Sequence, residues 1–206
     1  MRDRAPFIDR DGTLIEETGY LNDLSRLKFF PYSVDAVRQL KRAGFLVIVV
    51  TNQAGIARGI VPPEFLALAH GHISTVMAAG CAAMDRYYHC PHHPDGIVPG
   101  LALACACRKP APGLWHRAAE ELAVDLARSY TVGDRWLDVR AGHAAGTRTV
   151  MVRTGYGLGE APAPPDGVAA DAIVSDLAAA AAWILQQDAS AASSPATGSP
   201  RPPLSA

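Results

Sequence analysis

Short apolar runs alternate with helical patterns along most of this chain, and this alternation limits the folds open to it. The run FLVIVV (45–50) is apolar without alternation, as expected for a central strand covered on both faces. Further strands are predicted at PFI (6–8), DRYYHC (85–90), SYTVG (129–133), TRTVMV (147–152) and DAIVS (171–175). Helices are predicted at 33–44, 62–79, 112–124, 135–145 and in an Ala-rich segment that ends near Gln187. The pattern predicts an α/β fold, a doubly wound parallel sheet with helices on both faces.

Local signals indicate where some of these helices begin and end. Ser33 and Ser175 are predicted N-caps, because a serine hydroxyl can accept a hydrogen bond from a free amide of the first helical turn. Gly44 is predicted to end its helix, because glycine adopts the left-handed conformation found just past helix C-termini.

The length of 206 residues suits one domain with its own hydrophobic core. We expect this domain at residues 1–187, without a large cap domain between the sheet elements. The Ala/Ser/Pro-rich tail at 188–206 has too little apolar surface to offset ordering, so disorder is predicted there. The segment 157–168, rich in Gly and Pro, is predicted as a surface loop.

Charge and hydropathy exclude some partners. The formal net charge of −1 gives no electrostatic case for nucleic acid or an anionic membrane. No apolar run reaches the roughly 18 residues that a membrane span needs, and the N-terminus has no apolar core of a secretory signal. We expect a cytoplasmic monomer that acts on a small molecule.

Polar side chains follow four of the predicted strands or open the helix after them. In doubly wound sheets, ligands bind beyond the carboxyl ends of the strands, so these side chains are expected at one rim. They are Asp9 and Asp11; Thr51, Asn52 and Gln53; Arg108 and Lys109; and Asp134 and Asp138. Carboxylates hold Mg²⁺, while a lysine and a hydroxyl can bind phosphate oxygens. The set predicts Mg²⁺-dependent phosphoryl transfer rather than a solvated turn.

Asp9 and Asp11 are two positions apart, so both side chains point to the same side of an extended chain. Two crowded carboxylates repel, and burying them is costly unless a cation or proton relieves the site. One aspartate can attack phosphorus and form an aspartyl-phosphate, and the other can protonate the leaving oxygen and then activate water. Gly12 permits the tight turn that follows.

A second cluster, of thiols and imidazoles, lies in a long irregular stretch at about 90–107. Zinc prefers thiolate and imidazole ligands in a closed tetrahedral site. Cys90, His92, Cys105 and Cys107 would supply one full set, with His93 as a rival to His92. Such a structural zinc would order the loop and hold the adjoining Arg108 and Lys109 without doing chemistry. The alternative is two unrelated polar loops with free thiols.

Three remaining candidates receive structural interpretations. Cys81 is predicted to be a small buried hydrophobe. His70 and His72 flank Gly71 on a predicted helix and are predicted to be surface or packing residues.

The motifs DRDGT (9–13), Thr51 after FLVIVV, RKP (108–110) and GDRWLD (133–138) resemble those of haloacid dehalogenase superfamily phosphatases. The resemblance runs from about residue 5 to 185 and implies a Rossmann-like fold. It implies Asp9 as nucleophile, Asp11 as general acid/base, and Thr51 and Lys109 as phosphate ligands. It also implies that Mg²⁺ is bound by the side chains of Asp9 and Asp134 and by the backbone carbonyl of Asp11. Asp138 would support the metal ligands from behind, or else cap or pair on a helix surface.

The combination of ETGYL (17–21), TNQAGIARG (51–59), CPHHP (90–94) and CACRKP (105–110) is similar to the heptose-1,7-bisphosphate 7-phosphatase family, which serves nucleotide-activated heptose biosynthesis. This resemblance implies a phosphorylated sugar substrate. It implies substrate contacts from Glu17, Thr18, Gly19 and Tyr20, from Thr51, Asn52, Gln53 and Ala54, and from Arg108. Two alternatives stay open: a phosphatase of histidinol phosphate or another small phosphomonoester, and a catalytically silent binding module built on the zinc loop. The intact set of aspartates and Lys109 argues against the silent module.

Overall fold

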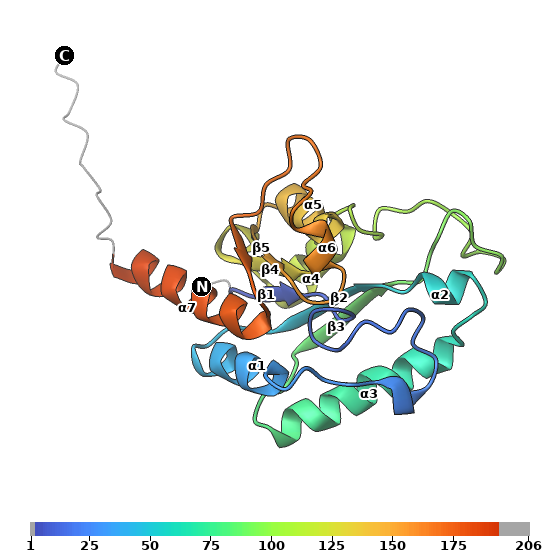
Figure 1. Cartoon of the computed structure of the whole chain (residues 1–206), viewed down its shortest axis with the longest axis horizontal. Helices are drawn as coiled ribbons and strands as arrows, with labels where there is room; N and C mark the ends of the chain where they lie inside the picture. Colours follow the sequence, from blue (N-terminus) through green and yellow to red (C-terminus); the bar gives the residue numbers. More distant parts are fainter. Residues whose placement is uncertain (1–2, 194–206) are drawn as a thin grey trace, which may run out of the picture.

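A six-stranded, wholly parallel sheet forms the centre of the protein, in the order β3-β2-β1-β4-β5-β6 (Figure 1). The computed structural model describes residues 3–193, with side chains for residues 3–191. The strands are β1 (Pro6–Ile8), β2 (Ile48–Asn52), β3 (Arg86–Cys90), β4 (Tyr130–Gly133), β5 (Arg148–Val152) and β6 (Ala172–Val174). The chain builds outward from β1 to β3 and then returns to add β4, so the strand order reverses between β1 and β4. The doubly wound α/β fold is therefore confirmed.

Helices cover both faces of the sheet (Figure 1). One face carries α1 (Ser33–Arg42), α3 (Pro63–Ala79) and α7 (Leu177–Ser193), and the other carries α4 (Gly113–Leu122) and α5 (Trp136–Ala145). Short elements complete the described chain: α2 (Ala54–Ala57), α6 (Gly157–Glu160) and 3₁₀ turns at Leu24–Arg26 and Leu126–Arg128. Within the described residues, the segments between β1 and β3 hold only these helices and turns, so there is no large cap domain.

Along the central strands, successive residues pack alternately into the hydrophobic layers on the two faces of the sheet. Ile8 and Val49 pack toward α1, α3 and α7, whereas Phe7, Ile48 and Val50 pack toward α4 and α5. This division follows from the two-residue period of a strand and explains why the central strands are apolar on both faces.

Four local predictions are corrected by the structure. The Ser33 hydroxyl donates to the carbonyl of Leu14 at 2.6 Å, so Ser33 does not cap α1. At α7, the Asp176 carboxylate accepts from the amide of Ala179 at 2.9 Å, where Ser175 was predicted to cap. Cys81 is exposed rather than buried. The predicted loop at 157–168 contains the short helix α6.

The C-terminal helix α7 continues to Ser193, past the predicted domain boundary at residue 187. Residues 194–206, the rest of the segment predicted to be disordered, lie outside the described residues. Among the helices that are described, none combines the length and the apolar character that crossing a bilayer requires.

Trp115 anchors α4 to the sheet, and its removal should destabilise the fold. The buried indole packs on Phe7, with ring centroids 5.8 Å apart, and donates to the Thr131 hydroxyl at 2.8 Å. Trp115→Ala leaves a large cavity and should lower the free energy of unfolding by about 3–5 kcal/mol, measured by urea denaturation. Trp115→Phe keeps most of the packing and should cost clearly less; equal losses would contradict this account.

Candidate active site

The predicted chemistry-bearing loops meet at the carboxyl ends of the strands, around the point where the strand order reverses. A pocket of about 310 Å³ opens there. Its lining includes all but one of the residues predicted for catalysis, Mg²⁺ or substrate: Asp9, Asp11, Glu17, Gly19, Tyr20, Thr51, Asn52, Gln53, Ala54, Arg108, Lys109, Asp134 and Asp138. Thr18 is not part of this lining; its carbonyl accepts from the Arg26 guanidinium at 2.5 Å. The position agrees with the general location of ligands in open α/β sheets.

Lys109 lies buried between two carboxylates at the floor of the pocket. Its Nζ is 2.6 Å from Asp9 Oδ1 and 2.5 Å from Asp138 Oδ1, and it also donates to the carbonyl of Val50 at 3.2 Å. Burial lowers the pKa of Lys109, but the nearby charges of Asp138 and Asp9 outweigh burial and raise it overall. Lys109 therefore stays charged and can meet an anionic substrate.

Asp134 is buried beside Asp9 and has one oxygen without a partner. Its Oδ2 accepts from the amide of Tyr156 at 2.7 Å, whereas Oδ1 makes no hydrogen bond. Burial, followed by the charges of Asp9 and Asp138, raises the pKa of Asp134 to about 9. Gly12, at φ +82°, packs against this carboxylate so closely that a Cβ would overlap it. A glycine is therefore needed at this turn both for the positive φ and for the absence of a Cβ.

The donor set fits a divalent cation. Asp9, Asp134 and Asp138 have carboxylate oxygens within 4.8 Å of one another, and within residues 3–191 the ammonium that contacts them is that of Lys109. When all three carboxylates are ionised, they outnumber this ammonium by two charges. Burial and the Asp138 and Asp11 charges also raise the pKa of Asp9 to about 7, against the pull of Lys109. A hard dication such as Mg²⁺ would relieve this crowding.

Asp138 is already engaged on both oxygens, so Asp9 and Asp134 are the better ligands. One Asp138 oxygen holds Lys109, and the other accepts from the Arg135 amide at 3.2 Å, at the start of α5. The side chain is 2% exposed, which contradicts the alternative of a residue on a helix surface, although it does help to cap α5. Asp138 therefore orients Lys109 and leaves Asp9 and Asp134 as the candidate ligands.

Asp11 is held apart from this group by its own partners. Arg10 donates to both Asp11 oxygens at 2.8–3.1 Å, and the Gln53 amide donates to Oδ2 at 3.0 Å. The same Gln53 nitrogen donates to the Thr51 hydroxyl at 2.8 Å. Two aspartates from one short turn thus have separate surroundings, as separate chemical roles require.

Asn52 clamps the loop that carries Lys109. Its amide oxygen accepts from the Lys109 backbone amide and its amide nitrogen donates to the Lys109 carbonyl, both at 3.1 Å. Both ends of the Asn52 side chain are therefore used within the protein, where they fix the backbone of Lys109.

Five residues that were not predicted also line the pocket: Leu21, Gly55, Arg135, Leu137 and Tyr156. The Arg135 guanidinium lies 4.9 Å from the centre of the Tyr156 ring and bonds Glu160 at 2.7 Å. Arg135 directly follows the predicted site residue Asp134 in the sequence, and this adjacency could have indicated that Arg135 lines the pocket. Tyr156 follows β5, and the rule on strand carboxyl ends would have pointed to it.

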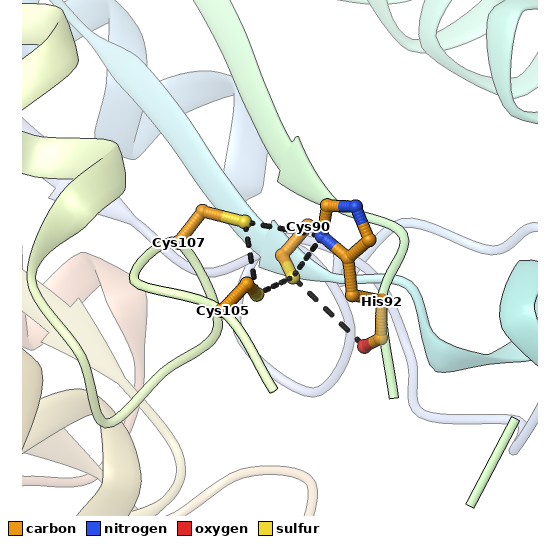
Figure 2. A group of neighbouring side chains, drawn as sticks. All are labelled: Cys90, His92, Cys105 and Cys107. Atoms are coloured by element: carbon orange, nitrogen blue, oxygen red, sulfur yellow. Dashed lines mark hydrogen bonds between the residues drawn. The ribbon is translucent and has the colours of Figure 1, made fainter. Parts of the chain in front are cut away.

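The four predicted zinc ligands point toward one another in a single cluster (Figure 2). Cys90 ends β3, and the other three come from the loop that follows. The Cys105 Sγ is 3.5 Å from Cys90 Sγ and 3.2 Å from Cys107 Sγ; the His92 Nδ1 is 3.7 Å from Cys90 Sγ and 3.4 Å from Cys107 Sγ. With Zn–S bonds of about 2.3 Å, two sulfur ligands of a tetrahedral site lie about 3.8 Å apart, and the shorter Zn–N bond brings a nitrogen ligand somewhat closer. The cluster therefore has the size of a zinc site.

The structure brings His92, and not His93, into this cluster. The His93 ring instead contacts the Arg58 guanidinium at 3.3 Å and accepts from the Asp95 amide at 3.1 Å. The carbonyl of His92 accepts from the Arg108 guanidinium at 3.2 Å, so the cluster is linked directly to the pocket lining.

Fold and site together define a hydrolase of the haloacid dehalogenase type. Residues 106–180 match a protein-family model described as HAD-hydrolase-like. A solved structure, the D,D-heptose 1,7-bisphosphate phosphatase from B. bronchiseptica complexed with magnesium and phosphate, matches with a TM-score of 0.78 and 32% identity. That match covers 89% of this chain and 99% of the other.

Two curated relatives narrow the assignment. D-glycero-beta-D-manno-heptose-1,7-bisphosphate 7-phosphatase from Yersinia pestis is 42% identical over 84% of this chain and 91% of the relative. D-glycero-alpha-D-manno-heptose-1,7-bisphosphate 7-phosphatase from Photorhabdus laumondii subsp. laumondii is 35% identical over 76% of this chain and 86% of the relative. The chain belongs to the D-glycero-D-manno-heptose-1,7-bisphosphate 7-phosphatase family and is a phosphoric monoester hydrolase.

Proposed function

We propose that this protein hydrolyses the 7-phosphate of D-glycero-β-D-manno-heptose 1,7-bisphosphate in a Mg²⁺-dependent reaction. The observation that carries the proposal is the 42% identity to a relative of that name over nearly the whole domain. The pocket chemistry supports it, because a buried lysine, paired aspartates and an arginine at the rim suit a phosphorylated, anionic substrate.

Asp9 is the proposed nucleophile. One of its carboxylate oxygens bonds to phosphorus, while the bond from phosphorus to the sugar oxygen breaks and its electron pair stays on that oxygen. Protonated Asp11 gives this oxygen its proton. Water then attacks the phosphorus of the aspartyl-phosphate and gives a proton to Asp11, which releases inorganic phosphate and regenerates Asp9.

The other pocket residues bind and orient the phosphate in this proposal. Lys109 and Thr51 would contact the transferring group, and Arg108 would pair with the second phosphate through its planar guanidinium. Asp9, Asp134 and the backbone carbonyl of Asp11 would hold Mg²⁺, which when bound neutralises charge on the phosphoryl oxygens. Glu17, Gly19, Tyr20, Gln53 and Ala54, which line the pocket, would border the sugar.

Cys90, His92, Cys105 and Cys107 are the proposed ligands of a structural zinc. Burial is the main cause that raises the pKa of the Cys90 and Cys107 thiols, so zinc would displace protons when it binds. Free thiols gathered in one cluster also suit a reducing compartment, and we propose that the protein works in the cytoplasm as a monomer.

Substrate choice is tested by phosphate release from purified protein with Mg²⁺. The compounds are the β and α anomers of the heptose 1,7-bisphosphate, fructose 1,6-bisphosphate and histidinol phosphate. The β anomer should show the highest kcat/KM, by at least about tenfold over fructose 1,6-bisphosphate and histidinol phosphate. A preference for histidinol phosphate would overturn the substrate assignment, and a preference for the α anomer would correct the stereochemistry alone.

A further inference from the structure

Behind the candidate general acid/base lies a buried arginine whose far side meets a histidine from another element. The Arg10 side chain is 2% exposed and folds back on its neighbour, so that Nε and Nη2 donate to both oxygens of Asp11. Its remaining nitrogen, Nη1, lies 3.4 Å from His70 Nε2 on α3. We infer that Arg10 and His70 are positioning residues that fix the carboxylate of Asp11 for proton transfer, an inference that rests on the proposed function.

The roles of the two nitrogens follow from their chemistry. A guanidinium has only donors and keeps its charge in proteins, so His70 Nε2 must be the acceptor in this contact. Burial, followed by the charges of Arg10 and His89, lowers the pKa of His70 to about 3. The ring is therefore neutral at physiological pH, and with the proton on Nδ1 it offers Nε2 as a lone pair to Arg10.

His70 is itself held in place. Its ring stacks on Tyr87 of β3, with centroids 4.6 Å apart and planes 23° from parallel. The Tyr87 hydroxyl in turn accepts from Ser74 Oγ at 3.0 Å, one turn along α3 from His70. A continuous series of contacts thus runs from α3 and β3 to the turn after β1.

This arrangement restrains Asp11 from its far side. Two N–H groups in a rigid fork fix the plane of a carboxylate, and the Gln53 amide adds a third contact to Oδ2. An acid that must reach one leaving oxygen loses rate when it is misplaced, by as much as about 10²-fold for an ångström. Without an acceptor at residue 70, one arm of the Arg10 fork is buried without a partner, and the guanidinium would shift.

The test compares three variants on α3. His70→Phe keeps a ring that can stack on Tyr87 but has no acceptor, and His70→Gln keeps an acceptor without the ring. His72→Phe, on the exposed side of the same helix, is the control. For each protein, kcat and KM are measured over phosphomonoesters that range from activated aryl esters to alkyl and sugar esters. Because kcat/KM reports the step in which the leaving group departs, it isolates the acid role of Asp11.

His70→Phe should lower kcat/KM for alkyl and sugar esters by about tenfold. For p-nitrophenyl phosphate, whose leaving group departs without a proton, the fall should stay within about twofold. His70→Gln should recover most of the loss, and His72→Phe should match the unaltered protein. Arg10→Lys keeps the positive charge but lacks the two guanidinium N–H groups that hold Asp11, so it should give the same ester-dependent loss. This variant replaces His70→Phe in the test if His70→Phe does not fold.

An equal fall on all esters, or no fall, would overturn the positioning role. That result would leave the proposed function intact as long as the unaltered protein and His72→Phe release phosphate with Mg²⁺. Failure of the proposed function would instead show as no Mg²⁺-dependent release from the unaltered protein.

Discussion

Replacing Asp9 by asparagine is expected to lower Mg²⁺-dependent phosphate release by at least about 10³-fold, because the amide cannot act as the nucleophile. The substitution keeps the shape of the side chain beside Lys109, whose Nζ is 2.6 Å from Asp9 Oδ1. The measurement is kcat with the heptose bisphosphate under saturating Mg²⁺. Asp35→Asn, at an exposed position on α1, is the matched control and should keep full activity. Unchanged turnover in Asp9→Asn would contradict the aspartyl-phosphate mechanism.

Loss of activity in this variant should not come from unfolding. Burial raises the pKa of Asp9 to about 7, so its ionised form destabilises the Mg²⁺-free fold increasingly as pH rises from about 4 to 7. Asparagine removes that charge. Above pH 7 and without Mg²⁺, the variant should therefore unfold at the same temperature as the unaltered protein or higher. A large drop in this temperature would assign the lost activity to instability instead.

Periodicity predicted the sheet well because apolar runs record burial on both faces. It placed the central strand too early: Phe45 and Val47 are buried before β2 begins at Ile48, and Thr51 and Asn52 belong to the strand itself. Burial without strand pairing gives the same apolar signal, so the pattern alone cannot locate the first paired residue.

Side-chain capping was less predictable because polar groups have several partners within reach. Ser33 stands where a cap is expected, but its hydroxyl bonds the carbonyl of Leu14 from the turn after β1. Such a contact depends on tertiary packing, which the local sequence does not contain. The same limit hid His70, whose acceptor role depends on an arginine from a distant segment.

The residues that form the active site were more predictable than the hydrogen bonds and ion pairs among them. Residue type and the ends of parallel strands were enough to group Asp9, Lys109 and Asp134. That Asp138 would hold Lys109, while Arg10 would hold Asp11, depends on rotamers and burial. Sequence patterns therefore predict which groups meet at a rim better than which of them pair.

Replacing one of the four proposed zinc ligands is the second change for which a large effect is expected. Cys107→Ser alters a cluster whose ligand atoms all lie within 4.8 Å of one another, directly before Arg108 and Lys109. Purified without chelators under reducing conditions, the unaltered protein should contain about one zinc per chain, and the variant close to none. Cys81→Ser, at an exposed cysteine outside the cluster, should keep the full zinc content.

The same variant should lose both stability and activity, because the cluster orders a long loop that carries binding residues. Loss of a structural zinc should lower the free energy of unfolding by at least about 3 kcal/mol, which lowers Tm by about 6–12 °C for a chain of this size. The His92 carbonyl accepts from Arg108, so loosening the loop should also raise KM for the bisphosphate. Lys109 has an independent clamp in Asn52, so kcat should fall less than KM rises. If the unaltered protein contains no zinc and has the same Tm and KM as Cys107→Ser, the three thiols and His92 meet without a metal.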